Sequence, residues 1–307
     1  MKTLVVATRG SALALWQANH VKARLEADDP GVSVELLVLK TQGDKILDVP
    51  LAQVGGKGLF VKEIEEALLD GRVDVGVHSL KDMPAVLPAG LTLAAYPPRE
   101  DPADVLVARG GAALADLPPG GVVGTSSLRR RVLLLRRRPD LRAEPIRGNV
   151  DTRLRKLEAG DYDALVMARA GLRRLGVEPP GARALPLDTF PPAVGQGILG
   201  VEARAGEGPL LELLATLDHT ETRMQAEAER AFLARLGAGC HTPVAGLARL
   251  DAGALVLQGL VASVDGVTVL EAMVSGAPTT GRALGEKLAE ELLARGAGAL
   301  LDASGGD

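Results

Sequence analysis

A shortage of cysteine and of aromatic residues limits what this chain can be. It has 307 residues, of which one is a cysteine, Cys240, and 2% are aromatic. A single cysteine excludes an intrachain disulfide. Because aromatic rings are few, small aliphatic side chains must build the core, and the rings that stack on single-stranded nucleic acid are scarce. We therefore expect no nucleic-acid partner.

Long apolar runs are also missing. No uncharged stretch approaches the roughly 20 residues that cross a bilayer. The opening MKTLVVATRG lacks the apolar core of a signal peptide. The histidines and the cysteine do not have the spacing of zinc ligands. We expect a cytoplasmic protein with no membrane partner and no metal.

Charge is distributed unevenly along the chain. The net charge is −4, yet the block from Arg129 to Lys156 holds eleven Arg or Lys residues against three acids. A basic block on an acidic protein favours a local site for anions over general affinity for nucleic acid. The alternative is a set of solvated helix faces.

The stretch Val73–Pro84, VDVGVHSLKDMP, predicts a site at the end of a strand. Alternating valines indicate a buried strand at Val73–Val77. The polar group that follows contains Ser79, Lys81 and Asp82. Ligands of open α/β sheets bind outside the carboxyl ends of strands, which is where these side chains would lie. The alternative is a charged junction in which Asp82 only forms a turn.

The start of the chain predicts a second part of the same site. A strand at Leu4–Ala7 leads through a polar loop into a helix over residues 12–27, with Ser11 as its N-cap. Backbone N–H groups at the start of a helix can bind an anion, and Arg9 adds a side-chain charge there. The alternative is that the cap serves only its own helix.

The middle of the chain repeats this pattern. A strand ending at Val123 leads into hydroxyl residues and a helix whose first turn carries Arg129, Arg130 and Arg131. A positive side chain at a helix N-terminus opposes the helix dipole and lowers stability by about 0.3–1 kcal/mol for each residue. We therefore expect these arginines to bind an external anion, with a solvated helix face as the alternative.

Two further arginines and one glutamine are candidate ligand contacts. Arg147 ends a strand predicted at Leu141–Arg147, and Arg153 lies on the helix that follows. Each guanidinium can grip a carboxylate with two parallel hydrogen bonds. Gln196 lies between two glycines and offers amide donors where the backbone can approach a ligand.

Proline-rich and glycine-rich segments indicate the domain organisation. Pro97–Asp104 and Phe190–Gly200 read as two crossings between lobes, and a strand at Ile198–Glu202 would rejoin the sheet of the first lobe. A long polar loop is predicted at Thr41–Gly58 and a short helix at Leu172–Leu175. After residue 218 a helix, three strands and a second helix indicate a small separate domain.

The expected fold class is therefore α/β, with two lobes joined by a double crossover and a small α+β C-terminal domain. The first domain comprises residues 1–97 and 198–216, the second 103–191 and the third 220–307. Two crossings between similar lobes form a hinged clamp around a cleft.

Cys240 lies in a glycine-rich loop, LGAGC, with His241 beside it. The usual role of a lone cysteine is that of a small buried apolar residue. A nucleophilic protease would need a base aimed at the sulfur, and adjacent residues tend to point apart. A covalent attachment point is the remaining functional interpretation.

Taken together, these motifs resemble one family. The chain resembles the porphobilinogen deaminases, also called hydroxymethylbilane synthases, from end to end. The matching stretches are ATRGSALALWQ, VGGKGLFVKEIE, VHSLKDMP, GTSSLRR, RGNVDTRL, PAVGQG and LGAGC. The resemblance implies two lobes like those of periplasmic binding proteins, a third domain, and a monomer. It also implies a dipyrromethane cofactor bonded through a thioether to Cys240, to which a transferase adds four porphobilinogen units with release of ammonia, giving hydroxymethylbilane for haem biosynthesis.

The resemblance also implies roles for individual residues. Asp82 is the catalytic group, kept ionised by positive neighbours and stabilising the cation that forms when ammonia leaves. The implied cofactor contacts are Cys240, Lys81, Asp82, Thr125, Ser127, Arg129, Arg130, Arg147, Gly148 and Gln196. The implied substrate contacts are Arg9, Ser11, Gln17, Lys57, Ser79, Arg147 and Arg153. Gln42, Gln53 and Gly10 depart from some relatives, which puts the contribution of the long polar loop in doubt.

A rival hypothesis is a non-catalytic anion-binding module built on the same two lobes. The missing export signal argues against a solute receptor, and the missing helix-turn-helix pattern argues against a transcriptional regulator. Such a module would also leave the Cys240 domain unexplained. Nucleic-acid binding through the arginine block is a third hypothesis, which the shortage of aromatic residues disfavours.

Overall fold

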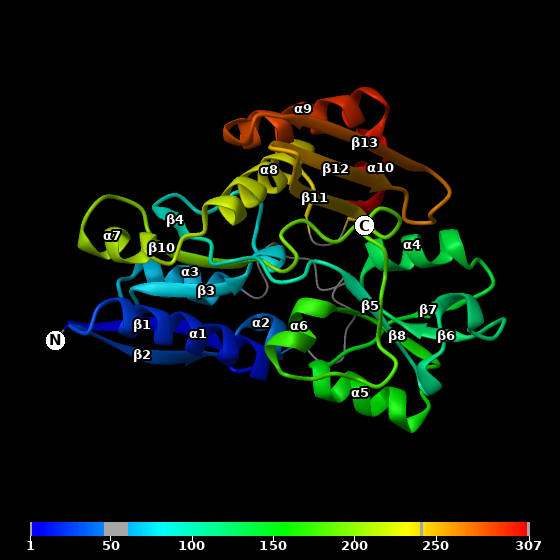
Figure 1. The fold of residues 1–307 in the computed structure, drawn as a ribbon, viewed down its shortest axis with the longest axis horizontal. Coiled ribbons are helices and arrows are strands. Elements are labelled where there is room, and N and C mark those ends of the chain that lie inside the picture. Colours follow the sequence, from blue (N-terminus) through cyan, green and yellow to red (C-terminus); the bar gives the residue numbers. More distant parts are fainter. Residues whose placement is uncertain (1, 46–60, 240–241, 306–307) are drawn as a thin grey trace.

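The computed structural model describes residues 2–45, 61–239 and 242–305. Two α/β lobes are joined by two crossings, and a third domain lies against both (Figure 1). The predicted α/β fold class is confirmed: two lobes joined by two crossings and a small α+β C-terminal domain. Within the described ranges, no helix has the length and apolar character needed to cross a membrane.

The first lobe is a five-stranded sheet with the order β2-β1-β3-β10-β4. Its elements are β1 (Lys2–Arg9), α1 (Ala12–Asp28), β2 (Val32–Leu39), α2 (Gln42–Lys45), α3 (Lys62–Leu69), β3 (Val75–Ser79), β4 (Leu91–Ala95), β10 (Leu199–Arg204) and α7 (Pro209–Ala215). β1 pairs in parallel with β2 and β3, whereas β10 runs antiparallel to β3 and β4. The parallel strands end on the same edge, so the loops after β1 and β3 meet there.

The second lobe has the equivalent order β7-β6-β8-β5-β9. Its elements are β5 (Asp104–Ala108), β6 (Val122–Gly124), α4 (Leu128–Arg137), β7 (Arg142–Glu144), α5 (Val150–Ala159), β8 (Ala164–Ala168), α6 (Arg169–Arg174) and β9 (Arg183–Ala184). In each sheet the fourth strand, β10 or β5, is antiparallel to the third. In the chain, β5 directly follows the first crossing and β10 directly follows the second crossing. The repeat expected from the sequence is therefore present in the topology.

The third domain is a three-stranded antiparallel sheet with helices on one face (Figure 1). Its elements are α8 (Thr220–Leu236), β11 (Val244–Asp251), β12 (Ala254–Ala262), β13 (Val269–Gly276), α9 (Gly281–Ala294) and α10 (Ala297–Gly305). Phe232 of α8 is fully buried in the core of this domain. Ala245 and Leu260 share a core with Phe190 and Leu133 of the second lobe, so the domain is anchored there by apolar contact.

One buried carboxylate, that of Glu229 on α8, connects the third domain to both crossings. Arg99 in the first crossing donates to it at 2.6 Å, and the backbone N–H of Gly195 in the second crossing donates at 2.6 Å. The N–H of Ala248 on β11 donates at 2.8 Å. Glu229 has 0% exposure, so the three domains meet at an ion pair removed from water.

Several local predictions were wrong. β5 and β9 were not predicted, and the short helix α6 begins at Arg169 instead of Leu172. The strand expected at Leu141–Arg147 covers only Arg142–Glu144, because Pro145 has no N–H to donate to a neighbour. The helix α2 occupies part of the predicted long loop, of which residues 46–60 lie outside the described ranges. The domain boundaries themselves remain a prediction.

We expect Glu229→Gln to lower the free energy of unfolding by about 3–5 kcal/mol, because it leaves the Arg99 charge buried without a counter-charge. Urea unfolding measures the change. The matched control is Glu290→Gln, which removes an exposed ion pair with Arg235 and should cost less than about 1 kcal/mol. Equal losses in the two variants would contradict this account of the junction.

Candidate active site

Predicted site residues of the first lobe surround one small cavity. Its volume is about 60 Å³, and its lining includes Arg9, Ser11, Gln17, Ser79 and Asp82. They come from the end of β1, the start of α1 and the end of β3, which lie on one edge of the sheet. The structure therefore brings these five together, as expected from their positions after strands.

Local hydrogen bonds hold this half of the site in place. The Ser11 hydroxyl accepts from the N–H of Ala14 at 3.3 Å and caps α1. The Gln17 amide, 2% exposed, donates to the Ser79 hydroxyl at 2.8 Å and ties α1 to the end of β3. Asp82 follows in a single 3₁₀ turn, Leu80–Asp82, and is half-buried.

The second lobe presents its own helix start to the site. Ser127 caps α4 by accepting from the N–H of Arg130 at 3.4 Å, and the Thr125 hydroxyl accepts from the N–H of Ser127 at 3.2 Å. Both hydroxyls thus have a structural role. Of the three arginines of the first turn, Arg131 is exposed, whereas Arg129 and Arg130 are buried.

Asp104 is the internal anion for the two buried arginines. One Asp104 oxygen accepts from Arg129 Nη1 at 2.8 Å, and the other from Arg130 Nη2 at 2.7 Å and Nε at 3.0 Å. Burial raises the pKa of Asp104, but the charges and hydrogen bonds of Arg129 and Arg130 outweigh this and hold it well below its usual range. Two of the three arginines therefore neutralise a carboxylate of the chain itself, and binding of an external anion by these arginines stays a prediction.

Gln196 connects the hydrogen-bond network of Asp104 to the first lobe. Its amide nitrogen donates to the Pro102 carbonyl at 2.7 Å and to Asp104 at 2.9 Å, so its donors face the protein. Its oxygen accepts from Lys81 Nζ at 3.3 Å and lies 3.5 Å from Arg130 Nη2. Gln196 is 1% exposed, and we conclude that it links Lys81 to the second lobe.

The glycine after Gln196 allows the two crossings to touch. Gly197 has φ +88°, and a Cβ there would lie 2.2 Å from the Glu100 carbonyl oxygen. The Gly197 carbonyl accepts from the N–H of Glu100 at 3.0 Å and from Arg174 at 2.7 Å. No side chain larger than hydrogen fits at this contact.

Cations from both lobes interact electrostatically with Asp82. Burial, with Arg130 as the next cause, lowers the pKa of Lys81 to about 8, and the charge of Asp82 partly opposes this. Burial, Arg130 and Arg147 lower the pKa of Arg153 to about 10, again opposed by Asp82. The charge of Asp82 thus acts on one cation from each lobe, Lys81 and Arg153, and Arg130 acts on both of these cations.

The turn before α5 orients Arg153. Gly148 has φ +111°, and its carbonyl accepts from Arg153 Nε at 2.8 Å. A Cβ at Gly148 would lie 2.6 Å from the Thr152 side chain, so glycine is required there. Arg147 immediately precedes this turn and is partly buried. Gly148 thus acts through its backbone.

Three residues named from the sequence, Cys240, Lys57 and Gln53, lie outside the described ranges. Within those ranges, no group of three or more His, Cys, Asp or Glu side chains could hold a metal ion. The sequence analysis missed Asp104 as a site residue. Its signal was an acid directly before the apolar run VLVA.

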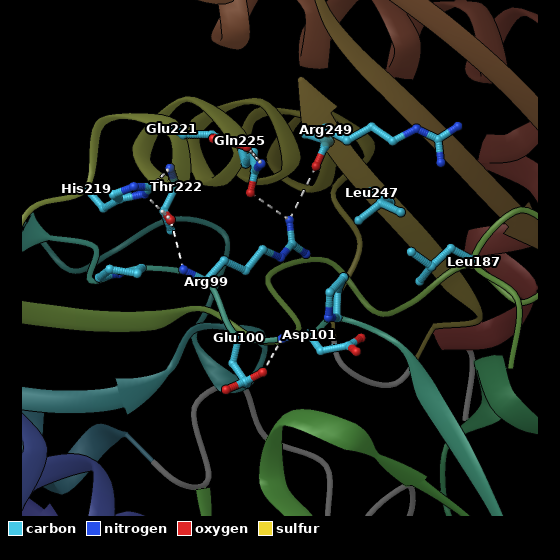
Figure 2. Close-up of a pocket in the computed structure, with 13 residues that line it drawn as sticks. Arg99, Glu100, Asp101, Leu187, His219, Glu221, Thr222, Gln225, Leu247 and Arg249 are labelled. Atoms are coloured by element: carbon cyan, nitrogen blue, oxygen red, sulfur yellow. Dashed lines mark hydrogen bonds between the residues drawn. The ribbon is translucent and has the colours of Figure 1, made fainter. Parts of the chain in front are cut away.

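A larger cavity, of about 320 Å³, lies away from these residues, between the first crossing, α8 and β11. Figure 2 shows Arg99 crossing it, with its N–H bonded to the Thr222 hydroxyl at 2.9 Å. Glu100 and Asp101 on its wall form ion pairs with Arg173 and Arg169. Because these acids already have partners, we assign the candidate site to the smaller cavity and the cations beside it.

Two family models and several known proteins match most of this chain. A family model described as the porphobilinogen deaminase, dipyromethane cofactor binding domain matches residues 4–212, and one described as the porphobilinogen deaminase C-terminal domain matches residues 223–294. A porphobilinogen deaminase of Nitratidesulfovibrio vulgaris (strain Miyazaki F) is 57% identical over 98% of this chain and 96% of its own length. Another, of Syntrophotalea carbinolica, is 53% identical over 98% of this chain and 95% of its own length.

We expect the Lys81 ammonium to lose its proton as the pH rises through about 8, because burial and Arg130 disfavour its charge. Competitive labelling with acetic anhydride, followed by peptide mass spectrometry, measures its reactivity against pH. Lys62, exposed on α3, is the control. The burial argument would be contradicted if the reactivity of Lys81 rose only as the pH approached the ordinary lysine pKa of about 10.4.

Proposed function

Because the chain belongs to the porphobilinogen deaminase family, we propose that it joins four porphobilinogen molecules head to tail, releasing ammonia at each addition. The product is the linear tetrapyrrole hydroxymethylbilane. The observation that carries this proposal is the placement of Asp82 at the small cavity with Arg9, Ser11, Gln17 and Ser79, where its charge acts on Lys81 of the first lobe and Arg153 of the second.

The substrate explains why so many cations are needed. Each porphobilinogen ring carries an acetate and a propionate, so a growing chain accumulates carboxylates. Lys81, Arg130, Arg147 and Arg153 carry charges that lie close enough to affect one another. Guanidinium groups grip carboxylates in a fixed planar geometry, so they orient a pyrrole as well as bind it. On the first lobe, we propose that Arg9, Ser11, Gln17, Ser79 and Lys57 bind substrate.

The same residues fit a dipyrromethane cofactor, which carries carboxylates of the same kind. When bound, it supplies the terminal pyrrole carbon to which the first substrate is added. We propose that Cys240 attaches it through a thioether and that Lys81, Thr125, Ser127, Arg129, Arg130, Arg147, Gly148 and Gln196 hold it. Arg129 and Gln196 are 3% and 1% exposed and bonded to Asp104, so they act mainly by fixing Arg130 and Lys81.

We propose Asp82 as the catalytic group. Loss of ammonia leaves an electron-poor pyrrole methylene on the substrate, and a fixed carboxylate stabilises the positive charge that develops. The 3₁₀ turn after β3 holds Asp82 at the small cavity, where the pyrrole N–H groups can donate to it. Preorganised charge that faces a developing charge is usually the largest single catalytic contribution.

The expected cytoplasmic location, the monomeric state and the three domain boundaries remain proposals. Size-exclusion chromatography with light scattering tests the oligomeric state. Limited proteolysis tests the boundaries, because cleavage is expected in the segments between the three sheets.

We expect intact-mass spectrometry of the purified protein to show an added mass equal to two pyrrole units. Peptide mapping should place it on Cys240, and Cys240→Ala should lack both the added mass and turnover. Cys240→Ser is the isosteric control and should also lack it, because an alcohol is a poor substitute for a thiol in this bond. Fully active protein with an unmodified mass would falsify the attachment.

We expect Asp82→Asn to keep the fold and the added mass but to reduce turnover by about 10²–10³-fold, because it removes the charge that faces the developing cation. Steady-state release of ammonia measures the loss, and circular dichroism checks the fold. Asp116→Asn, in the short turn at Leu114–Asp116 of the second lobe, is the control. Turnover of Asp82→Asn close to that of the control would remove Asp82 from the mechanism.

A further inference from the structure

Three titratable side chains are buried together beneath the strand that leads to Asp82. They are His78 on β3, Glu202 on β10 and Glu65 on α3, with exposures of 5%, 0% and 7%. His78 Nε2 lies 3.0 Å from Glu202 Oε2. The mechanism derived above uses none of them.

Strand register and Gly76 explain why this cluster forms. On the antiparallel pair β3–β10, Gly200 is opposite His78 and Glu202 is opposite Gly76, so all four residues face α3. A Cβ at Gly76 would lie 2.8 Å from His78 Nε2, so the imidazole lies over this glycine. Gly76 thus leaves room for the imidazole beside α3, whereas a Cβ at Gly200 would meet the apolar side chains of Leu93, Met83 and Leu80.

Two carboxylate oxygens in this cluster, Glu65 Oε1 and Glu202 Oε1, are buried without a hydrogen-bond partner among the described residues. A buried acceptor without a donor costs about 1–3 kcal/mol. Burial and the charge of Glu202 raise the pKa of Glu65 to about 7, although His78 opposes the shift. A proton on one carboxyl would supply the missing donor and remove one of the two buried charges.

We propose that Glu65 is a neutral acid in the folded protein and donates its proton to Glu202, while His78 binds the other oxygen of Glu202. The three side chains then form one hydrogen-bonded row from α3 across β10 to β3. Glu65 is a positioning residue: it fixes the face of β3 from which Ser79 and the turn with Asp82 extend. This last step rests on the proposed function, whereas the buried proton does not.

Other charges near the cluster have partners of their own. Glu66, next to Glu65, forms an exposed pair with Lys62. Arg204 on β10 donates to the carbonyls of Leu68 and Val73 at 2.7 Å. Arg230 on α8 affects Glu202 electrostatically, but its hydrogen bonds go to the carbonyls of Pro84 and Ala85. None of these charged groups of the described residues donates to the two oxygens, and the proton that we propose on Glu65 supplies the missing donor.

The pH dependence of stability tests the proton directly. With the pKa of Glu65 raised from 4.5 to about 7, its contribution to stability is complete below pH 4.5 and is lost as the pH rises to about 7. Glutamine mimics the neutral acid at every pH. As the pH rises from 4.5 to about 7, the melting temperature of the wild type should therefore fall relative to that of Glu65→Gln. The difference between the wild type and Glu66→Gln should not change with pH in this way. Parallel curves for Glu65→Gln and the wild type would overturn the proposal.

Infrared spectroscopy provides a second measurement on the unmodified chain. At pH 6 the wild type should show the C=O stretch of a protonated carboxyl in a dry environment, and Glu65→Gln should lack it. Persistence of this band in the variant would assign the proton to another group and overturn the proposal.

Turnover tests the positioning role. Glu65→Ala, which breaks the row, should lower kcat about tenfold through misplacement of the catalytic turn. Glu65→Gln should restore it, because its amide N–H can donate to Glu202. Equal turnover in the Ala and Gln variants would overturn the positioning role. A wild type that does not consume porphobilinogen would instead refute the proposed function, and the melting and infrared results would still decide on the proton.

Discussion

The site depends on the buried carboxylate of Asp104. It neutralises Arg129 and Arg130, and through Gln196 it is connected to Lys81 on the other lobe. Without a counter-charge, two guanidinium groups could not be held at 3% and 7% exposure beside a site meant for anions. The negative charge of Asp104 thus offsets the free energy needed to bury these cations, so they can stay in place without a ligand.

The two lobes are held in a fixed relative position because the two crossings are hydrogen-bonded to each other and to the third domain. Gly197 and Glu100 join the crossings, and Glu229 joins both of them to α8 and β11. These contacts are buried and charged, so removing one partner is far more costly than the loss of a surface pair. These contacts therefore fix the two crossings and the third domain to one another at the base of the two lobes.

Much of the fold could be predicted from the sequence. The strand predicted at Val73–Val77 is present two residues later as β3, and the strand predicted at Ile198–Glu202 rejoins the first sheet as β10. Hydroxyl residues predicted the starts of α1, at Ser11, and of α4, at Ser127. β5 was not predicted, because Asp104 was read as the end of a charged crossing. Whether an acid is solvated or buried between two arginines depends on strands that pair across more than 50 residues, and local periodicity carries no such information. The same holds for Glu65 and Glu202, which read as ordinary helix and strand polar residues.

The electrostatics of the candidate site fit the proposed ligand, which carries several carboxylates. Burial and neighbouring cations lower the pKa values of Lys81 to about 8 and Arg153 to about 10, so the positive charges are held at a cost in free energy. A bound carboxylate reverses that cost, since each negative charge stabilises several cations at once. A neutral ligand of the same shape would gain apolar contact but would leave the repulsion in place. On the proposed function, the repulsion among these cations would favour ligands that carry several carboxylates, such as a pyrrole with an acetate and a propionate.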